Sequence, residues 1–269
     1  MAENSLKRKP DNNNHERAQK KKRLEGGSRR FIDGPGVWIT CVKGKERQTV
    51  GEIYDLFDSV ASEIWPVEGE DEDGAAGSDG EELSLEAQIA KEVSEIKKPR
   101  SEQRFANCLT DTQCVVFMSC KPPVDPVELV MKYIQNIQET GVTRTRHTQR
   151  LVPVSDTCTA TIPDIKALCL KLFEKFFSKE KDTKFKYKIE LRIRNHTTLT
   201  RPIVIQHIAS WVPEGHTVSL DNPDIFILVE IFKSICGVSI VRDYYKLSKF
   251  NVLEVANATR KQQSESVAE

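Results

Sequence analysis

The stretch from Lys184 to Arg201, KFKYKIELRIRNHTTLTR, alternates apolar and charged side chains as far as Arg194. This period of two predicts a β-strand with one face in the core. The cations of the other face would recur about every 6.5–7 Å, close to the spacing of phosphates along a nucleic-acid strand. The strand therefore predicts a nucleic-acid contact, unless its lysines only protect a solvated sheet edge.

Charge is segregated along the 269 residues, although 40 Lys and Arg balance 40 Asp and Glu. Residues 1–35 carry two basic clusters and few large apolar side chains, which predicts a disordered tail. We expect this tail to be a nuclear address or a nucleic-acid arm, and the protein to be nuclear or nucleolar, unless the tail only aids solubility. No apolar run is long enough to span a bilayer, and none resembles a secretory signal.

A first folded part is predicted over residues 36–154. Strands are expected at 37–42, 112–121 and from 151, and helices at 45–65 and 127–139, where apolar residues recur at helical spacing. Pro66 would end the first helix and Gly141 the second. Residues 66–100 form an acidic, partly disordered insert, with an amphipathic helix expected at 83–96. This order predicts half of a split β-α-β, ferredoxin-like layer with the insert at its edge.

A second unit is predicted over residues 155–255, followed by a disordered tail at 256–269. Its helices are expected from Thr161 to Phe177 and from Arg201 to Trp211, the latter with Ile203, Ile208 and Trp211 in the core. Besides the cationic strand, short apolar runs predict strands at 217–220, 225–233 and 237–241.

Other cations would extend the basic surface. Lys45 and Arg47 stand at a predicted helix N-terminus, where the N–H groups suit a phosphate oxygen, although an ordinary turn would look the same. Arg144, Arg146 and Arg150 form a basic connection into the strand from residue 151.

Motifs in the second unit resemble a THUMP domain, in that family's order. They are the cationic strand ending in Arg-Asn-His at 194–196, Ile-Ala-Ser-Trp-Val at 208–212, Val-Ser-Leu-Asp-Asn-Pro-Asp at 218–224 and Ile-Leu-Val-Glu-Ile at 227–231. Three further motifs narrow the resemblance to one group within that family: Ile-Thr-Cys at 39–41, Gly-Lys-Glu-Arg at 44–47 and Lys-Ser-Ile-Cys-Gly at 233–237. Residues 36–255, apart from the insert, resemble the eukaryotic THUMP adaptors that support N4-acetylcytidine formation in tRNA.

The resemblance implies an α+β to α/β fold class, with an N-terminal ferredoxin-like layer followed by a THUMP α/β domain. It implies a non-catalytic adaptor that presents the D-arm of serine and leucine tRNAs to a separate RNA cytidine acetyltransferase with an ATPase/helicase module. That partner would use acetyl-CoA and ATP, and this chain would hold no cofactor or metal and bind no membrane. THUMP modules bind tRNA near its acceptor end through basic surface. The implied contacts are Lys184, Lys186, Lys188, Arg192, Arg194, Asn195, His196 and Arg201, with Arg144, Arg146, Arg150, Lys45 and Arg47 as additions from the first part.

Two other classes of function stay open. An enzyme is disfavoured because no Gly-rich dinucleotide turn or phosphate loop is present, and nothing pairs Cys41, Cys120 or Cys236 with a histidine base. His207, on an apolar helix, is expected in the core. The seven cysteines form no C-x-x-C pair, which predicts buried, reduced thiols and no zinc site. The other alternative is a nuclear scaffold that binds a basic partner through the acidic insert, with no RNA role.

Overall fold

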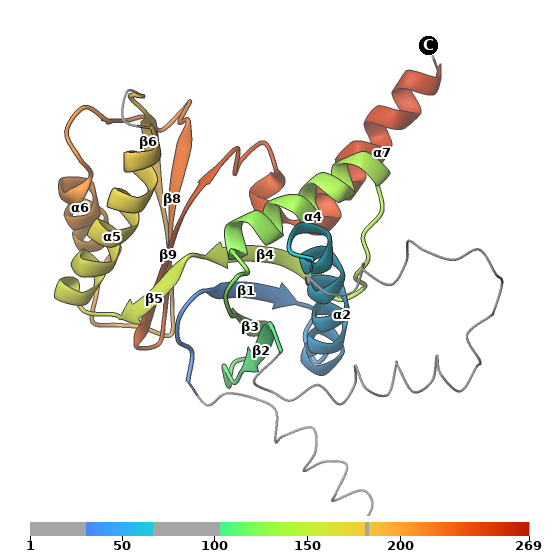
Figure 1. The fold of residues 1–269 in the computed structure, drawn as a ribbon, viewed down its shortest axis with the longest axis horizontal. Coiled ribbons are helices and arrows are strands. Elements are labelled where there is room, and N and C mark those ends of the chain that lie inside the picture. Colours follow the sequence, from blue (N-terminus) through green and yellow to red (C-terminus); the bar gives the residue numbers. More distant parts are fainter. Residues whose placement is uncertain (1–30, 67–102, 181–182, 269) are drawn as a thin grey trace, which may run out of the picture.

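The computed structural model describes residues 31–66, 103–180 and 183–268. In these ranges two β-sheets lie side by side, and helices cover one face of each sheet (Figure 1). The basic tail before residue 31 and the acidic insert, with its expected helix, fall outside the described residues. No helix in the described ranges is long and apolar enough to cross a membrane.

The first sheet confirms the ferredoxin-like layer. Its strands are β1 (Gly36–Cys41), β2 (Phe105–Cys108), β3 (Val115–Cys120) and β4 (Thr148–Val154), and its helices are α2 (Glu46–Ile64) and α4 (Pro126–Thr140). The order β2-β3-β1-β4, with antiparallel neighbours throughout, is the complete β-α-β-β-α-β arrangement. The sequence did not predict β2, a short strand of mixed polarity. The strand expected from residue 112 begins only at Val115, because Asp111 and Cys114 have positive φ (46° and 61°).

The second sheet contains the cationic strand. Its strands are β5 (Asp156–Thr159), β6 (Lys186–Arg194), β7 (Thr217–Val218), β8 (Ile225–Phe232) and β9 (Ile235–Arg242), in the order β5-β9-β8-β6-β7. The helices α5 (Ile162–Phe177) and α6 (Arg201–Trp211) cover one face and confirm the predicted helices. β6 runs parallel to β8 along its whole length and pairs with the short β7 only at Lys186 and Tyr187.

Alternation along β8 separates two cores. Its odd-numbered residues, from Ile225 to Ile231, pack with α5 and α6. Phe226, Leu228 and Phe232 point the other way and pack with the first sheet. Trp38 of β1 joins the two sheets, because its ring centroid lies 4.6 Å from that of Phe117 and 4.8 Å from that of Phe232.

Two expectations about α6 are wrong. Ile203 is exposed, and the buried stripe of the helix consists of Val204 and Ile208, four residues apart. His207 lies beside this stripe rather than on it. It is therefore exposed, with its ring stacked on Trp211.

The expected disordered tail after Val255 is also wrong. Residues Val252–Ala268 form the helix α7, which lies along α4 (Figure 1). Ala256 and Thr259 are buried there, and Arg260 donates a hydrogen bond from Nε to the carbonyl of Gly141 (2.7 Å). Gly141 ends α4 in the left-handed conformation (φ 66°), as predicted. Polarity misled the prediction, because only one narrow side of α7 needs to be apolar to pack on α4.

Candidate nucleic-acid interface

The cationic face of β6 is turned toward the first sheet rather than toward open solvent. Arg192 pairs in register with Glu230 of β8, and Arg194 with Phe232. Side chains of paired residues share a face of the sheet, so both arginines lie on the side where Phe232 packs with the first sheet. They are consequently half-buried. The predicted alternation is confirmed, but its charged face lines a space between the two sheets.

That space is a cleft of about 740 Å³ that gathers three arginines from two distant segments. Arg192 and Arg194 come from β6, and Arg150 comes from β4 of the first sheet. Thr112 and Cys114 of the β2–β3 loop also line the cleft. We call the space between these residues the arginine cleft. It brings together Arg150, Arg192 and Arg194, which the sequence proposed as RNA contacts on separate grounds.

A buried carboxylate, Glu230, organises the arginine cleft. Its Oε1 lies 3.7 Å from Nη1 of Arg192, and the side chain is almost fully buried. Burial raises the pKa of Glu230, although Arg192, Arg194 and Arg150 all pull it down. Burial likewise lowers the pKa of Arg194, and repulsion from Arg192 and Arg150 adds to that shift.

The cleft is left with an excess of positive charge. Three guanidiniums act electrostatically on one carboxylate, to which Arg192 alone lies close, and Nε of Arg150 is buried without a hydrogen-bond partner among the described residues. Such a group of incompletely paired guanidiniums in a partly buried site suits the oxygens of a phosphate.

Sequence reasoning missed Glu230. A signal was present, because Glu230 is the one charged residue in the strand IFILVEIF. A buried acid almost always has a partner. The lone Glu230 in this apolar strand therefore predicts a cation beside it.

The first half of β6 differs from its second half. Lys184 and Lys186 are exposed. Lys188 is engaged, since its Nζ donates to the carbonyl of Leu220 (3.1 Å) and lies 4.6 Å from the ring centroid of Tyr245. Lys188 therefore packs against the protein, while its two neighbours on the same face are free to meet a ligand.

His216 holds the start of β6, and its protonation should weaken the fold. Its Nδ1 accepts a hydrogen bond from the N–H of Phe185 (3.1 Å), and its ring stacks on Phe177. Burial lowers the pKa of His216, so between the two pKa values the unfolded chain binds more protons than the folded chain. The contribution of His216 to the free energy of unfolding is therefore complete above about pH 6.5, the ordinary pKa of histidine. It is lost as the pH falls through the pKa of His216 in the folded state.

We expect the stability difference between the wild type and His216→Asn to shrink as the pH falls from about 7.5 to 5.5. The Asn side chain keeps an acceptor for Phe185 but does not titrate. Urea unfolding of both proteins at several pH values measures the difference. A difference that is constant with pH would contradict a partly buried His216 that is neutral in the folded protein.

Three of the proposed contacts have structural roles. Nε2 of His196 accepts from the N–H of Leu199 (3.0 Å), and its Nδ1 lies 2.6 Å from the carbonyl of Lys233, which places the ring proton on Nδ1. Arg201 donates from Nη1 to the carbonyl of Leu191 (2.5 Å) and so fixes the first turn of α6 on β6. Asn195 turns the chain with φ 52°.

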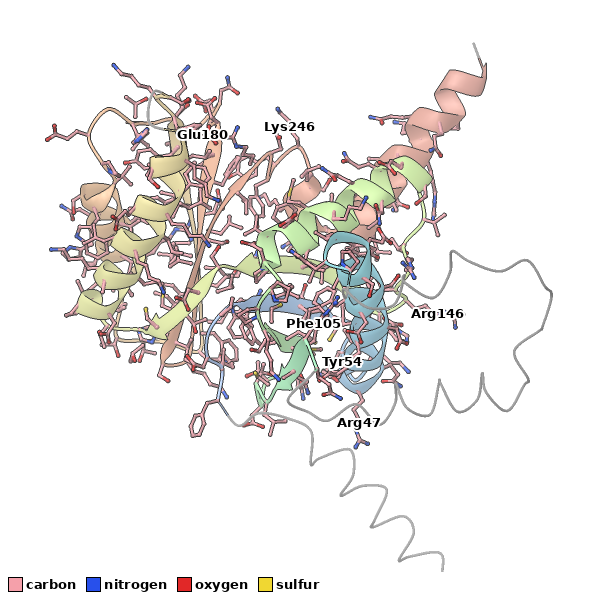
Figure 2. The ribbon with its side chains drawn as sticks, viewed as in Figure 1. Arg47, Tyr54, Phe105, Arg146, Glu180 and Lys246 are labelled. Atoms are coloured by element: carbon pink, nitrogen blue, oxygen red, sulfur yellow. The ribbon has the colours of Figure 1, made fainter. Side chains whose placement is uncertain are left out.

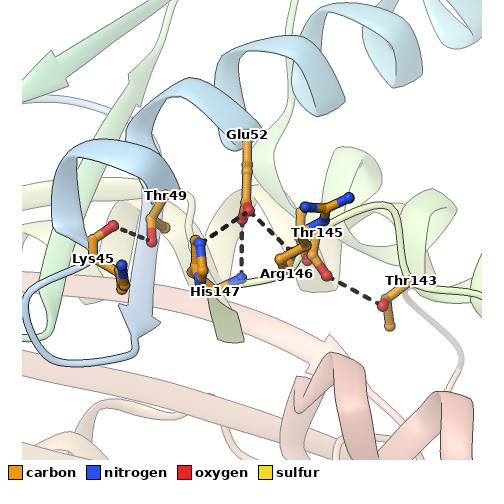
Figure 3. Close-up of polar contacts among 7 residues, drawn as sticks. All are labelled: Lys45, Thr49, Glu52, Thr143, Thr145, Arg146 and His147. Atoms are coloured by element: carbon orange, nitrogen blue, oxygen red, sulfur yellow. Dashed lines mark hydrogen bonds and ion pairs between the residues drawn. The ribbon is translucent and has the colours of Figure 1, made fainter.

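The basic connection between α4 and β4 is held by Glu52 of α2 (Figure 3). Its carboxylate accepts from the N–H groups of Arg146 and His147 (3.1 Å each). Arg144 donates from Nη1 to Oγ of Ser59 (3.0 Å). The side chain of Arg146 extends from the α2 side of the molecule, away from the second sheet (Figure 2). The structure therefore separates Arg144 and Arg146 from Arg150, which lies in the arginine cleft.

The first turn of α2 offers less to an anion than its sequence suggested. Oε1 of Glu46 accepts from the N–H groups of Gly44 (3.3 Å) and Cys114 (2.9 Å). The bond from Cys114 is the main cause that lowers the pKa of Glu46. A carboxylate already lies at this helix N-terminus, so Lys45 and Arg47, both exposed, are left as ordinary surface cations.

The candidate thiol nucleophiles have unfavourable surroundings. Burial raises the pKa of Cys41 and Cys120, and a hydrogen bond with Cys158 together with burial raises the pKa of Cys236. A thiol with a raised pKa is a poor nucleophile at neutral pH, because the thiolate is the reactive form. All seven cysteines are free, and five of them are buried.

The second unit matches the THUMP domain family over residues 159–241, from the end of β5 to β9. The chain therefore contains a THUMP domain. An uncharacterized protein of Schizosaccharomyces pombe is 35% identical over 222 residues, which cover 82% of this chain and 75% of that protein. THUMP domain-containing protein 1 of Bos taurus is 31% identical, with 90% of this chain and 70% of that protein covered. The tRNA acetyltransferase TAN1 of Saccharomyces cerevisiae is 30% identical, with 86% and 88% covered. The chain thus belongs to the family of THUMP domain-containing protein 1 and TAN1.

Proposed function

We propose that the chain is a tRNA-binding adaptor that presents tRNA to a separate RNA acetyltransferase. Membership of the family that includes a protein named tRNA acetyltransferase TAN1 supports this proposal. The observation that carries the RNA contact is the arginine cleft, where Arg150, Arg192 and Arg194 line one space and only Arg192 has an ion pair, with Glu230, among the described residues.

The finer parts of the proposal rest on the family resemblance. We propose serine and leucine tRNAs as ligands and N4-acetylcytidine in the D-arm as the product. The acetyltransferase would bring the ATPase/helicase module and use acetyl-CoA and ATP. The basic clusters within residues 1–35 support the nucleus or nucleolus as the place where the complex forms.

The chemistry of the cleft fits a phosphate-binding role. A guanidinium can bind two phosphate oxygens at once, which a lysine ammonium does less well. Bonds to phosphate position the RNA but carry little sequence information. Selection among tRNAs would therefore come from the shape of the RNA or from the partner enzyme. The exposed Lys184 and Lys186 would add weaker contacts beyond the cleft.

The adaptor proposal predicts that acetylation needs two proteins. The purified chain with tRNA, acetyl-CoA and ATP is expected to form no acetylcytidine, whereas addition of the acetyltransferase restores the product. Mass spectrometry of digested tRNA measures the modified nucleoside. Product formed by this chain alone would make it an enzyme. Acetylation of the same tRNA by the acetyltransferase without this chain would remove the need for an adaptor.

A further inference from the structure

Two hydrogen bonds tie the second sheet to the β2–β3 loop at the mouth of the arginine cleft. Nζ of Lys233, in the turn between β8 and β9, donates to the carbonyl of Thr110 (2.7 Å). Nδ2 of Asn195, in the turn after β6, lies 3.4 Å from Oγ1 of Thr112. We call this pair of contacts the latch.

The second-sheet half of the latch is held by hydrogen bonds within the second sheet. Lys233 and Asn195 both have positive φ (52° each), a conformation that costs free energy for residues other than glycine. His196 joins the two turns through the carbonyl of Lys233, and the N–H of Lys233 donates to the carbonyl of Arg194 (3.0 Å). The backbone that presents Lys233 is therefore hydrogen-bonded directly to an arginine of the cleft.

The first-sheet half is also fixed. Oγ1 of Thr110 donates to the carbonyl of Val115 (2.7 Å), and Thr110 is buried. The N–H of Cys114 donates to Glu46 at the start of α2 (2.9 Å). The loop that receives the latch thus has supports on both sides, from β3 and from α2.

The position of the latch links it to the arginine cleft. Thr112 and Asn195, which form one of its contacts, both line the cleft. Arg150 belongs to the first sheet, whereas Arg192 and Arg194 belong to the second, so their separation depends on how the sheets are held at this end. The ammonium of Lys233 is directed at a protein carbonyl rather than into the cleft.

We propose that Lys233 is a positioning residue that sets the spacing of the three arginines by holding the two sheets together at the cleft mouth. The part of this inference that concerns RNA rests on the proposed function, whereas the part that concerns the two sheets does not. Lys233 is a cation near the cleft, but in this proposal its ammonium binds a protein carbonyl and not an RNA phosphate.

The test compares Lys233→Met, which keeps the aliphatic stem and removes the ammonium, with Lys233→Arg, which keeps a donor. Lys171→Met is the matched control, because it removes an exposed ammonium from α5 on the other side of the second sheet. Hydrogen exchange without RNA is measured first. We expect Lys233→Met to speed exchange in residues 110–115 and 195–199, and Lys233→Arg and Lys171→Met to leave both segments near the wild-type rate.

The affinity for tRNA is then measured across a salt series. A positioning residue predicts about a ten-fold weaker affinity for Lys233→Met with an unchanged slope of log affinity against log salt, because the number of phosphates bound stays the same. A direct contact predicts a slope that is smaller by about 0.7–0.9.

A reduced slope with unchanged exchange would make Lys233 an RNA contact and overturn the proposal. Faster exchange with unchanged affinity would overturn the link to the cleft. A wild-type chain that binds no tRNA would refute the proposed function, while the exchange data would still decide whether the latch holds the sheets.

Discussion

Replacing Arg150, Arg192 and Arg194 together by Gln is expected to weaken tRNA binding by at least about 100-fold at physiological salt. These guanidiniums are the cations that the two sheets bring into one cleft, and each charge-assisted hydrogen bond contributes about 1.5–3 kcal/mol. Losses at neighbouring sites are not additive, so we expect about 3 kcal/mol in total, which corresponds to about 100-fold. Fluorescence anisotropy with labelled tRNA measures the affinity.

Two controls distinguish the effect of losing the cleft arginines from the effects of losing the fold and of changing the net charge. Adding Glu230→Gln to the triple variant removes a carboxylate that would otherwise stay buried without a cation, and thermal melting then shows that the fold persists. A second triple variant replaces the exposed Lys166, Lys175 and Lys261 of α5 and α7 by Gln and changes the net charge equally. Equal losses in the two triple variants would attribute binding to overall charge and contradict a role for the cleft.

Trp38→Ala is expected to lower the free energy of unfolding by about 3–5 kcal/mol. Trp38 is 4% exposed and touches rings of both sheets, Phe117 in the first and Phe232 in the second. Truncation leaves a cavity in the core that the sheets share, so one substitution should destabilise both units at once. Urea unfolding followed by circular dichroism measures the change.

Trp38→Phe is the matched variant. It keeps an aromatic ring and removes the buried Nε1–H, which has no hydrogen-bond partner among the described residues. The loss should therefore be smaller than for Ala, because the cavity is smaller and an unpaired donor disappears. If Trp38→Ala cost less than about 1 kcal/mol, or if the two units unfolded separately, the shared core would be refuted.

Much of the fold follows from local periodicity. The alternation from Phe185 to Ile193 predicted β6 and its two faces, and helical spacing predicted α2, α4, α5 and α6 close to their observed bounds. Local pattern fails where the deciding contact is distant. β2 and β5 are short strands of mixed polarity that are held by their partners β3 and β9. The helix α7 is mostly polar, and the few residues that it buries, such as Ala256 and Thr259, are recognised only from its packing on α4 and β4.

The site was predictable in part for the same reason. The residue types and spacing in β6 indicated a cationic face, but nothing local indicates that this face is turned toward the first sheet. The meeting of Arg150 with Arg192 depends on the packing of two sheets, which the order of elements does not specify. Conversely, nothing in the local sequence indicates that His196 and Arg201 hold the turn and the helix after the cationic strand, or that Asn195 reaches the β2–β3 loop of the first sheet.

The salt dependence of tRNA binding tests most directly whether the arginine cleft binds RNA phosphates. The affinity of the wild-type chain is measured from low to high salt beside the variant lacking the cleft arginines and the variant lacking the three control lysines. Loss of three phosphate contacts should reduce the slope of log affinity against log salt by about 2 for the cleft variant, and the control slope should match the wild type. Equal slopes for the wild type and the cleft variant would contradict phosphate binding by the arginine cleft.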